Sequence, residues 1–285
     1  MDIQLRSGTP ADAEACGRIC YEAFTRISEA HGFARDFPAP EVAIGLVTWM
    51  LGHPEFYSVV AEMDGRVVGS NFLDERNPIA GVGPITVDPA VQNRSLGRRL
   101  MDAVDARAVA KRFAGVRLIQ AGYHTRSLSL YAKLGYEVRE HLACMQGKPV
   151  GTTIEGHAVR LATEDDLPGC NKLCRQIHGH DRGGELHDAI RQGSASVVEH
   201  DGRITGYATI LGFFGHACGE SNDDLKALIG AAKEFAGPGF LLPTRNGELF
   251  RWCLTNGIRV TQPMVLMSKG LYNEPAGAFL PSILY

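Results

Sequence analysis

The stretch VDPAVQNRSLGRRLMDAV, residues 87–104, passes from the end of an apolar segment through a short polar turn into an amphipathic helical pattern. The preceding segment, VGPITV at residues 82–87, is rich in β-branched residues and ends at Asp88 and Pro89, as a buried strand does at a chain breaker. After the turn, apolar residues recur at helical spacing: Leu96, Leu100, Met101, Val104 and Ala108. The sequence therefore predicts a strand, a polar turn and a helix.

The polar turn lies where the predicted helix begins. The first backbone N–H groups of a helix have no partner within it, and the helix dipole is positive there, so the position suits a phosphate group. Gly97 allows close approach to the backbone, and the Ser95 hydroxyl can either cap the helix or donate to a phosphate oxygen. A capped helix after a strand, with no ligand, is the alternative.

The turn resembles the signature of the GCN5-related N-acetyltransferase (GNAT) family, which has Gln or Arg, two residues, Gly, one residue, then Gly or Ala. Here Ser95 replaces the usual first glycine. The resemblance implies that the backbone amides of the turn hold the pyrophosphate of coenzyme A and that the preceding strand pairs with the pantetheine arm. Arg98 or Arg99 could meet the 3′-phosphate, or the basic helix face could simply be solvated. The implied cofactor-binding residues are Ile85, Thr86, Val87, Gln92, Asn93, Arg94, Ser95, Leu96, Gly97, Arg98 and Arg99.

A second stretch, HTRSLSLYAKLGYEV at residues 124–138, resembles the family's next conserved segment. Tyr131 stands where many members have the tyrosine that protonates the departing coenzyme A thiolate. A phenol with an ordinary pKa near 10 can serve as this acid because the thiolate is a base of comparable strength. The alternative is that Tyr131 only packs in the core.

The base that would take the proton from an amine has several candidates. His124 stands where the family usually has asparagine, and its imidazole can accept a proton or merely bond to backbone. Glu75 and Asp74 follow a predicted hairpin strand and are rival bases, or else solvated bystanders.

The chain contains an internal repeat. LRSGTPADAEACGRIC at residues 5–20 is answered by VRLATEDDLPGCNKLC at residues 159–174, and DGR turns recur at Asp64 and Asp201. Each half predicts a mixed α/β domain with a central, mostly antiparallel sheet flanked by helices, so we expect two tandem GNAT-like domains. The boundaries are residues 1–147 for the acetyl-CoA-binding domain, 148–157 for a linker and 158–285 for a degenerate second domain with a C-terminal tail.

The second half lacks the predicted chemistry. Its corresponding helix begins with Asp223 and Asp224, which would cap the helix themselves and repel a diphosphate. Cys253 stands at the position that matches Tyr131. We interpret this half as a scaffold that completes the acceptor pocket or forms an interface, such as that of a homodimer.

Composition excludes several other classes. The net charge of -3 offers no broad basic surface for nucleic acid or an anionic membrane. The start of the chain has no signal-peptide pattern, and no apolar run approaches the roughly 20 residues of a membrane span, so we expect a cytoplasmic protein. Seven cysteines without a C-x-x-C motif indicate core thiols. The spacing of His178, His180, Asp181 and His187 matches no standard zinc motif, so we predict no metal.

The final stretch, YNEPAGAFLPSILY at residues 272–285, ends in apolar residues, and its prolines disfavour a helix. We expect an extended segment docked in a groove. Such a tail would either seal domains or subunits together, or carry the Tyr285 carboxylate toward Tyr131 as the catalytic base, as some tandem members of the family are thought to do.

These observations predict an N-acetyltransferase that moves the acetyl group of acetyl-CoA to a primary amine of a small-molecule acceptor, by direct attack and without a metal. A coenzyme-A-binding regulatory or assembly protein without turnover is the alternative, and a longer acyl donor is a further one. The sequence does not identify the acceptor, because specificity in such folds resides in loops and pockets.

Overall fold

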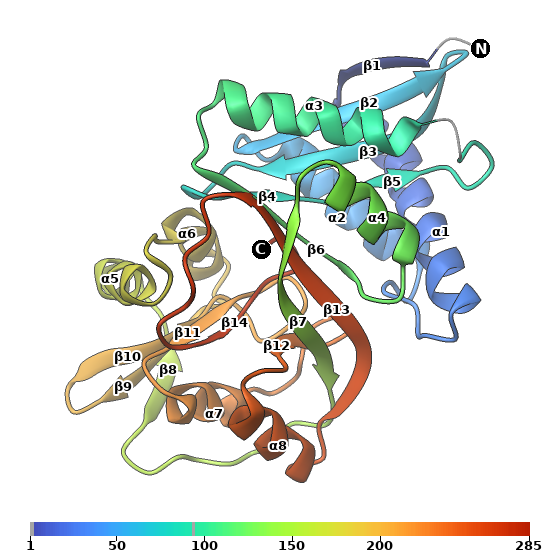
Figure 1. Ribbon diagram of the computed structural model, residues 1–285. Coiled ribbons are helices and arrows are strands. Elements are labelled where there is room, and N and C mark those ends of the chain that lie inside the picture. The colour runs from blue at the N-terminus through green and yellow to red at the C-terminus, as the bar shows by residue number, and fades with distance from the viewer. Residues whose placement is uncertain (1–2, 93–94) are drawn as a thin grey trace.

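The computed structural model of the protein describes residues 3–92 and 95–285 (Figure 1). The first half contains β1 Ile3–Ser7, a 3-10 turn Pro10–Asp12, α1 Ala13–Ala30, α2 Pro40–Gly52, β2 Phe56–Met63, β3 Arg66–Asp74, β4 Ala80–Val82, β5 Thr86–Val87, α3 Leu96–Ala110, β6 Gly115–Ala121, α4 Thr125–Lys133 and β7 Glu137–Gln146.

The second half repeats this order without a counterpart of β5. It contains β8 Ala158–Leu161, a 3-10 turn Glu164–Asp166, α5 Leu167–His178, α6 Gly183–Arg191, β9 Ser196–His200, β10 Arg203–Ala208, β11 Ala217–Gly219, α7 Asn222–Ala231, β12 Phe240–Pro243, α8 Gly247–Thr255, β13 Arg259–Gly270 and β14 Ala278–Leu280. The mixed α/β fold of two similar halves is confirmed.

The described strands form two sheets. One has nine strands in the order β1-β2-β3-β4-β6-β13-β7-β12, with β5 paired to β3, and the other has five in the order β14-β11-β10-β9-β8. Among the described pairs, β4 with β6 is parallel and the other named pairs are antiparallel. The predicted mostly antiparallel character is therefore correct.

The larger sheet contains strands from both halves of the chain. β13 lies between β6 and β7, with Met264 opposite Ala121 on one side and Leu142 on the other. β7 in turn pairs with β12. The predicted linker, residues 148–157, does not divide the sheet, because β12 and β13 of the second half pair with strands of the first half.

The segment predicted as one strand, residues 82–87, is two short strands. β4 ends at Val82 and β5 begins at Thr86, with Gly83, Pro84 and Ile85 between them. Gly83 has φ 137°, a backbone region that favours glycine, and proline supplies no N–H to a ladder. The predicted single strand was therefore wrong at residues 83–85, where Gly83 and Pro84 break the pairing.

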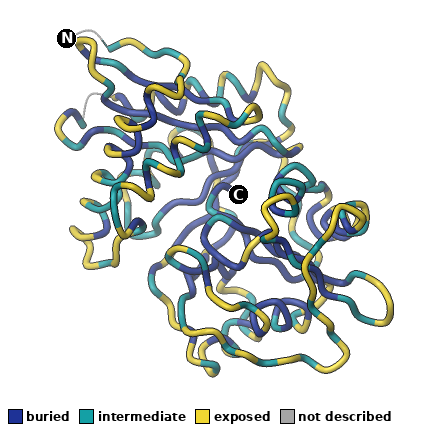
Figure 2. The backbone as a smooth tube through the Cα atoms, turned by 180° about the vertical axis from the view of Figure 1, so that it is seen from behind, coloured by how far each residue is buried: buried dark blue, intermediate teal, exposed yellow. Residues whose placement is uncertain are grey.

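Helices cover both faces of the larger sheet in the first half. α3 packs on β2 and β3, and its five predicted apolar residues are all buried in one core with Val59 and Leu73. α1 and α2 pack on the other face around Val47, Val60 and Phe72. Figure 2 shows buried strands running through the centre of the molecule, where the C-terminal end also lies.

The repeat is confirmed at the level of individual hydrogen bonds. Arg6 donates to both carboxylate oxygens of Asp12 at 2.8 and 2.7 Å, and Arg160 donates to Asp166 at 2.7 and 2.7 Å. Each aspartate also accepts from the backbone N–H and hydroxyl of a threonine three residues earlier, which completes a capping box. Both halves therefore start their first helix in the same way.

The C-terminal tail is extended, as predicted. β14 pairs with β11, and the Ile283 N–H donates to the Phe213 carbonyl at 2.8 Å. Tyr285 is 4% exposed and packs in a core that contains Ile119 of the first half and Leu241 of the second. The tail thus joins elements from both halves of the chain.

Two further findings concern the chain as a whole. All seven cysteines are free and buried. Within residues 3–92 and 95–285, every helix is too short or too polar to cross a membrane.

The two capping boxes predict a response to acid. The Arg6 guanidinium lowers the pKa of Asp12 to about 2, and Arg160 likewise holds the pKa of Asp166 below its usual range. A carboxylate whose pKa is lowered by folding stabilises the fold above its unfolded pKa, about 3.9, and loses that contribution as pH falls through the folded value. Urea unfolding should therefore give a decreasing free energy of unfolding between pH 5 and pH 2.

Replacing both carboxyl groups, by Asp12→Asn with Asp166→Asn, should lower the unfolding free energy at pH 7 by about 2 kcal/mol, near 1 for each lost cap. The same double variant should show a smaller decrease between pH 5 and pH 2. Asp165→Asn, a change at an exposed neighbour, serves as the control. Equal pH dependence in the double variant and the control would contradict this account.

Candidate active site

A cavity of about 530 Å³ opens where β5 and β6 separate. The register between β4 and β6 pairs Ala80 with Val116 and Gly81 with Arg117, and β5 pairs only with β3 among the described strands. The cavity is lined by the segment between β4 and β5, the end of β6, the starts of α3 and α4, parts of α1 and α2, and residues of the second half.

The start of α3 forms one part of the cavity wall. Ser95, Leu96, Gly97 and Arg98 line it together with Gln92, whereas Asn93 and Arg94 lie outside the described residues. α3 follows Ser95 directly, so the free N–H groups of its first turn are at this wall. The structure therefore brings most of the predicted phosphate turn to the cavity.

Ser95 does not cap α3 with its side chain. Its backbone has φ 58°, in the left-handed region, and its hydroxyl makes no capping hydrogen bond. This backbone conformation favours glycine, which is the residue that the family signature has at this position. An added Cβ on Gly97 would lie 3.6 Å from Leu130 Cδ2, an ordinary contact, so packing within the chain does not require glycine there.

Three cationic side chains line the same region of the cavity: Arg98, Arg126 and Lys133. Arg98 and Arg126 are exposed, and Arg126 approaches Gln92 Oε1 at 3.5 Å. Arg99 is directed elsewhere, because its guanidinium donates to the Ile3 carbonyl at 2.8 Å. Of the two arginines predicted to meet a phosphate, only Arg98 is therefore among the lining residues.

The strand residues predicted to pair with pantetheine also line the cavity. Ile85, Thr86 and Val87 are all at the wall, and Thr86 and Val87 are held on their other side by Ser70 and Gly69 of β3. Their edge toward β6 is left without a strand partner among the described residues. An extended ligand with amide groups can pair with such an edge, as in other β-strand additions.

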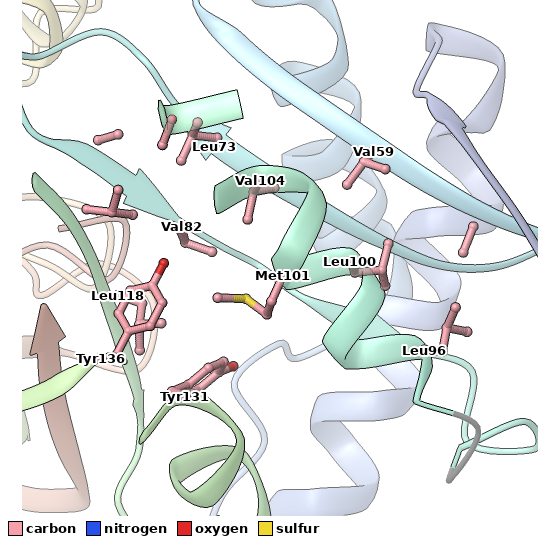
Figure 3. Close-up of a cluster of buried hydrophobic side chains, with 14 of the residues drawn as sticks. Val59, Leu73, Val82, Leu96, Leu100, Met101, Val104, Leu118, Tyr131 and Tyr136 are labelled. Atoms are coloured by element: carbon pink, nitrogen blue, oxygen red, sulfur yellow. The ribbon is translucent and has the colours of Figure 1, made fainter. Parts of the chain in front are cut away.

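Tyr131 lines the cavity from α4 and is 6% exposed. Figure 3 shows its ring among the apolar side chains that pack beside α3, near Met101 and Leu118. Burial raises its pKa above the usual value near 10, so the hydroxyl keeps its proton at neutral pH. Its hydroxyl has no hydrogen-bonding partner among the described residues, unlike that of Tyr136, which donates to Asp105 at 2.7 Å.

His124 is the residue before α4 and lines the cavity. Burial, and then the charges of Arg126 and His31, lower its pKa, which favours the neutral imidazole. Its side chain does not cap α4, whereas Asn246 at the equivalent place in the second half accepts from the Leu249 N–H at 3.3 Å. The imidazole of His124 therefore makes no capping hydrogen bond to α4.

The structure does not bring the two rival carboxylates to the cavity. Glu75 accepts two hydrogen bonds from Arg107, at 2.6 and 2.9 Å, and Asp74 accepts from Arg76 at 2.9 and 2.6 Å. Neither carboxylate is among the residues that line the cavity. Each is held by an arginine, which explains why it does not project toward the opening.

Tyr285 lies behind the cavity wall. Ile283 and Leu284 line the cavity, but the Tyr285 ring packs between elements of both halves. The guanidinium groups of Arg117 and Arg182 lie 4.0 and 4.4 Å from its centroid, and its hydroxyl is 3.2 Å from His180 Nε2. These contacts are those expected of a tail that seals the two halves together. The role of the Tyr285 carboxylate as a base stays a prediction.

Sequence reasoning missed several polar residues at the wall, and Gln120 and Asp36 are two of them. Gln120 on β6 accepts from the Ser127 hydroxyl at 2.6 Å, and its buried Nε2 has no partner among the described residues. Asp36, in the loop between α1 and α2, accepts from Gln262 Nε2 at 2.9 Å. Neither belongs to a motif, so no pattern in the sequence could have found them.

The corresponding helix start in the second half is closed by its own side chains. Asp224 accepts from the Ser221 N–H and hydroxyl at 2.9 and 3.0 Å, and it is 1% exposed. Cys253 occupies the seventh position of α8, as Tyr131 does in α4, and is fully buried. Asp224 therefore takes part in capping this helix, as predicted, whereas Asp223 accepts from Lys226 at 2.8 Å; the predicted lack of an anion site in this half stays a prediction.

The histidine-rich segment of the second half is divided between core and surface. His178 and His180 are buried, whereas His187 is 3.5 Å from Glu164 at the surface and Asp181 pairs with Arg175. In the part of the chain that the structure describes, no group of three His, Cys, Asp or Glu side chains could hold a metal ion.

Comparisons with known proteins agree with this geometry. Residues 54–138 match the family model described as an acetyltransferase (GNAT) domain. The sequence matches none of the curated proteins.

Three solved structures share the fold over nearly the whole chain. A proposed acetyltransferase from Pyrococcus horikoshii is 16% identical with a TM-score of 0.74, covering 97% of this chain and 94% of its own. A GCN5-related N-acetyltransferase from Sphaerobacter thermophilus is 16% identical with a TM-score of 0.61, covering 95% and 96%. A tandem GNAT protein from the clavulanic acid biosynthesis pathway is 14% identical with a TM-score of 0.59, covering 99% and 100%. Residues 54–138 are therefore similar to a GNAT acetyltransferase domain, and nearly the whole chain shares the fold of a tandem GNAT protein.

Proposed function

We propose that the protein transfers an acetyl group from acetyl-CoA to a primary amine. The observation that carries this proposal is one continuous cavity that joins an anion-binding helix start, an unpaired strand edge and the unpartnered hydroxyl of Tyr131. These three features match, in order, the diphosphate, the pantetheine arm and the thioester of acetyl-CoA. The residues present therefore fit the cofactor.

The cofactor would be held mainly by backbone and cationic groups. The first turn of α3 would meet the diphosphate, and Arg98, Arg126 and Lys133 would supply positive charge beside it. The edge of residues 82–87 would accept the pantetheine amides, and the free Nε2 of Gln120 would donate to a ligand carbonyl after a small shift. Asn93 and Arg94 remain predicted contacts.

The transfer requires three proton movements. An ammonium group first loses a proton to a base, for which His124 is the predicted residue at the cavity. The amine nitrogen then attacks the thioester carbonyl carbon, a carbon–nitrogen bond forms and the carbon–sulfur bond breaks. Tyr131 gives its proton to the sulfur, and the phenolate recovers a proton from the nitrogen of the product by way of solvent. The products are an amide and coenzyme A thiol.

A change at Ser95 tests the diphosphate site. Ser95→Asp would place a carboxylate at the helix start and should weaken coenzyme A binding by about 10²-fold, because like charges placed together cost several kcal/mol. Isothermal titration calorimetry with coenzyme A measures this affinity. Ser95→Asn is the matched control. Asparagine also tolerates the left-handed backbone, and it has nearly the same size as aspartate but no charge.

The expected result is a large loss of affinity for Ser95→Asp and a small change for Ser95→Asn. Equal affinities in the two variants would contradict a diphosphate at this turn. Two equivalent binding sites in the wild-type titration would also contradict it, since the second half has no open helix start.

A pair of tyrosine variants tests the acid. Tyr131→Phe should lower kcat for thiol release by about 10²- to 10⁴-fold, the range for a positioned acid, and leave the affinity for coenzyme A unchanged. It should also leave Tm nearly unchanged, since the lost hydroxyl has no hydrogen-bonding partner among the described residues.

Tyr136→Phe is the control, because this neighbouring tyrosine does not line the cavity and donates to Asp105. It should lower Tm and retain turnover. An undiminished rate in Tyr131→Phe would return Tyr131 to a packing role. Absence of thiol release with every amine tested, despite coenzyme A binding, would favour a cofactor-binding protein without turnover.

A further inference from the structure

The part of the cavity formed by α1, α2 and the second half is mainly apolar. Its wall is built from the side chains of Phe24, Ile27, Phe37, Leu46, Phe213, Phe214, Met264, Ile283 and Leu284. The cationic side chains of the lining come instead from α3 and α4. A ligand that enters this part would therefore bury an apolar body.

Asp36 is the one carboxylate among the described lining residues of the cavity. Its Oδ1 accepts from Gln262 Nε2 at 2.9 Å, and its other oxygen has no partner among the described residues. Burial raises its pKa, while the bond from Gln262 opposes that rise. A carboxylate in this setting gains the most from a ligand that brings a positive charge.

Asp36 is half-buried, and several fully buried carboxylates of this chain already have a cationic partner. Asp74 pairs with Arg76, Glu140 with Arg245 and Glu185 with Arg182. In residues 3–92 and 95–285, no lysine, arginine or histidine forms an ion pair with Asp36. The cavity thus contains a negative charge that the chain itself leaves unneutralised.

The orientation of Asp36 is fixed by residues from both halves. Gln262 on β13 is 4% exposed, and its Oε1 accepts from the Tyr123 hydroxyl at 3.0 Å. This bond directs the amide nitrogen of Gln262 toward Asp36. Gln262 of the second half thereby orients Asp36 in the mainly apolar part of the cavity. The start of α3, where the cofactor is proposed to bind, belongs to the first half.

We propose that Asp36 binds the ammonium group of the acceptor and that the acceptor class is a primary amine on an apolar body, such as an alkyl or arylalkyl amine. This inference rests on the proposed function, because it assigns the acceptor of the same transfer. Polar polyamines and amino sugars fit poorly, since their second polar group would be buried against phenylalanine and leucine side chains without a partner.

Binding without chemistry tests the assignment. Enzyme saturated with coenzyme A, which has no acyl group to transfer, is titrated with n-hexylamine, 1-hexanol and putrescine. We expect n-hexylamine to bind at least about 10-fold more tightly than either other ligand, because only it combines one charge with an apolar chain. Asp36→Asn should weaken the binding of n-hexylamine by about 10- to 100-fold and leave the affinities for 1-hexanol and coenzyme A unchanged.

The control is Glu29→Gln, which removes an exposed carboxylate near the same loop, one that pairs with Arg35. It should bind all three ligands as the wild type does. Unchanged n-hexylamine affinity in Asp36→Asn, or equal affinity for n-hexylamine and 1-hexanol, would overturn the inference.

Turnover with acetyl-CoA separates the two proposals. Thiol release that is faster with putrescine than with n-hexylamine, and equally fast in Asp36→Asn, would overturn the acceptor class and keep the acetyltransferase. Asp36-dependent binding of n-hexylamine without thiol release from any amine would support the ammonium site and overturn acetyl transfer.

Discussion

The register between β4 and β6 ends at Gly81 and Arg117, and the cavity depends on this opening in the sheet. Gly83 and Pro84 turn the chain away from β6, and β5 then pairs with β3 alone among the described strands. β6 stays extended because β13 pairs along its other side from Gly115 to Ala121. Backbone groups of residues 82–87 thereby lack a strand partner on the side of β6 and can pair with a ligand. The other strands of the sheet keep their pairing.

The opening also divides the charges of the cavity. The side formed by α3 and α4 has a helix start and three cationic side chains, while the side formed by α1, α2 and the second half has Asp36 among apolar residues. The proposed anionic cofactor and cationic acceptor would thus be drawn to different sides of one space. Tyr131 lines the same space from α4, where the proposed transfer would release a thiolate.

The second half takes part in the first half's site although it has lost its own. Asp224 closes the start of α7, and Cys253 replaces the tyrosine. Its β13 instead completes the nine-stranded sheet and supplies Gln262 and Met264 beside the cavity. The second half thus serves the cavity as a wall and a strand partner.

Local patterns allowed much of this to be predicted from the sequence. The repeated Arg6 and Arg160 motifs, the DG turns and the spacing of Leu100 and Val104 depend on neighbours within a few residues, so the sequence contains their cause. The break at Gly83 and Pro84 had a signal, because a Gly-Pro pair interrupts strands, but the β-branched run obscured it.

The remaining features depend on contacts between distant parts of the chain. The insertion of β13 pairs residue 115 with residue 270, and strand patterns do not name their partners. Asp36 is a single loop aspartate, and its proposed role depends on its having no cationic partner among residues 3–92 and 95–285. Only a three-dimensional structure shows this.

The most direct test of the account is a crystal structure of the protein with acetyl-CoA bound. We predict one cofactor per chain, with its diphosphate at the first turn of α3, its pantetheine along residues 82–87 and its thioester beside Tyr131. A cofactor at the start of α7, or one whose thioester lies away from Tyr131 and the cavity between β5 and β6, would contradict it.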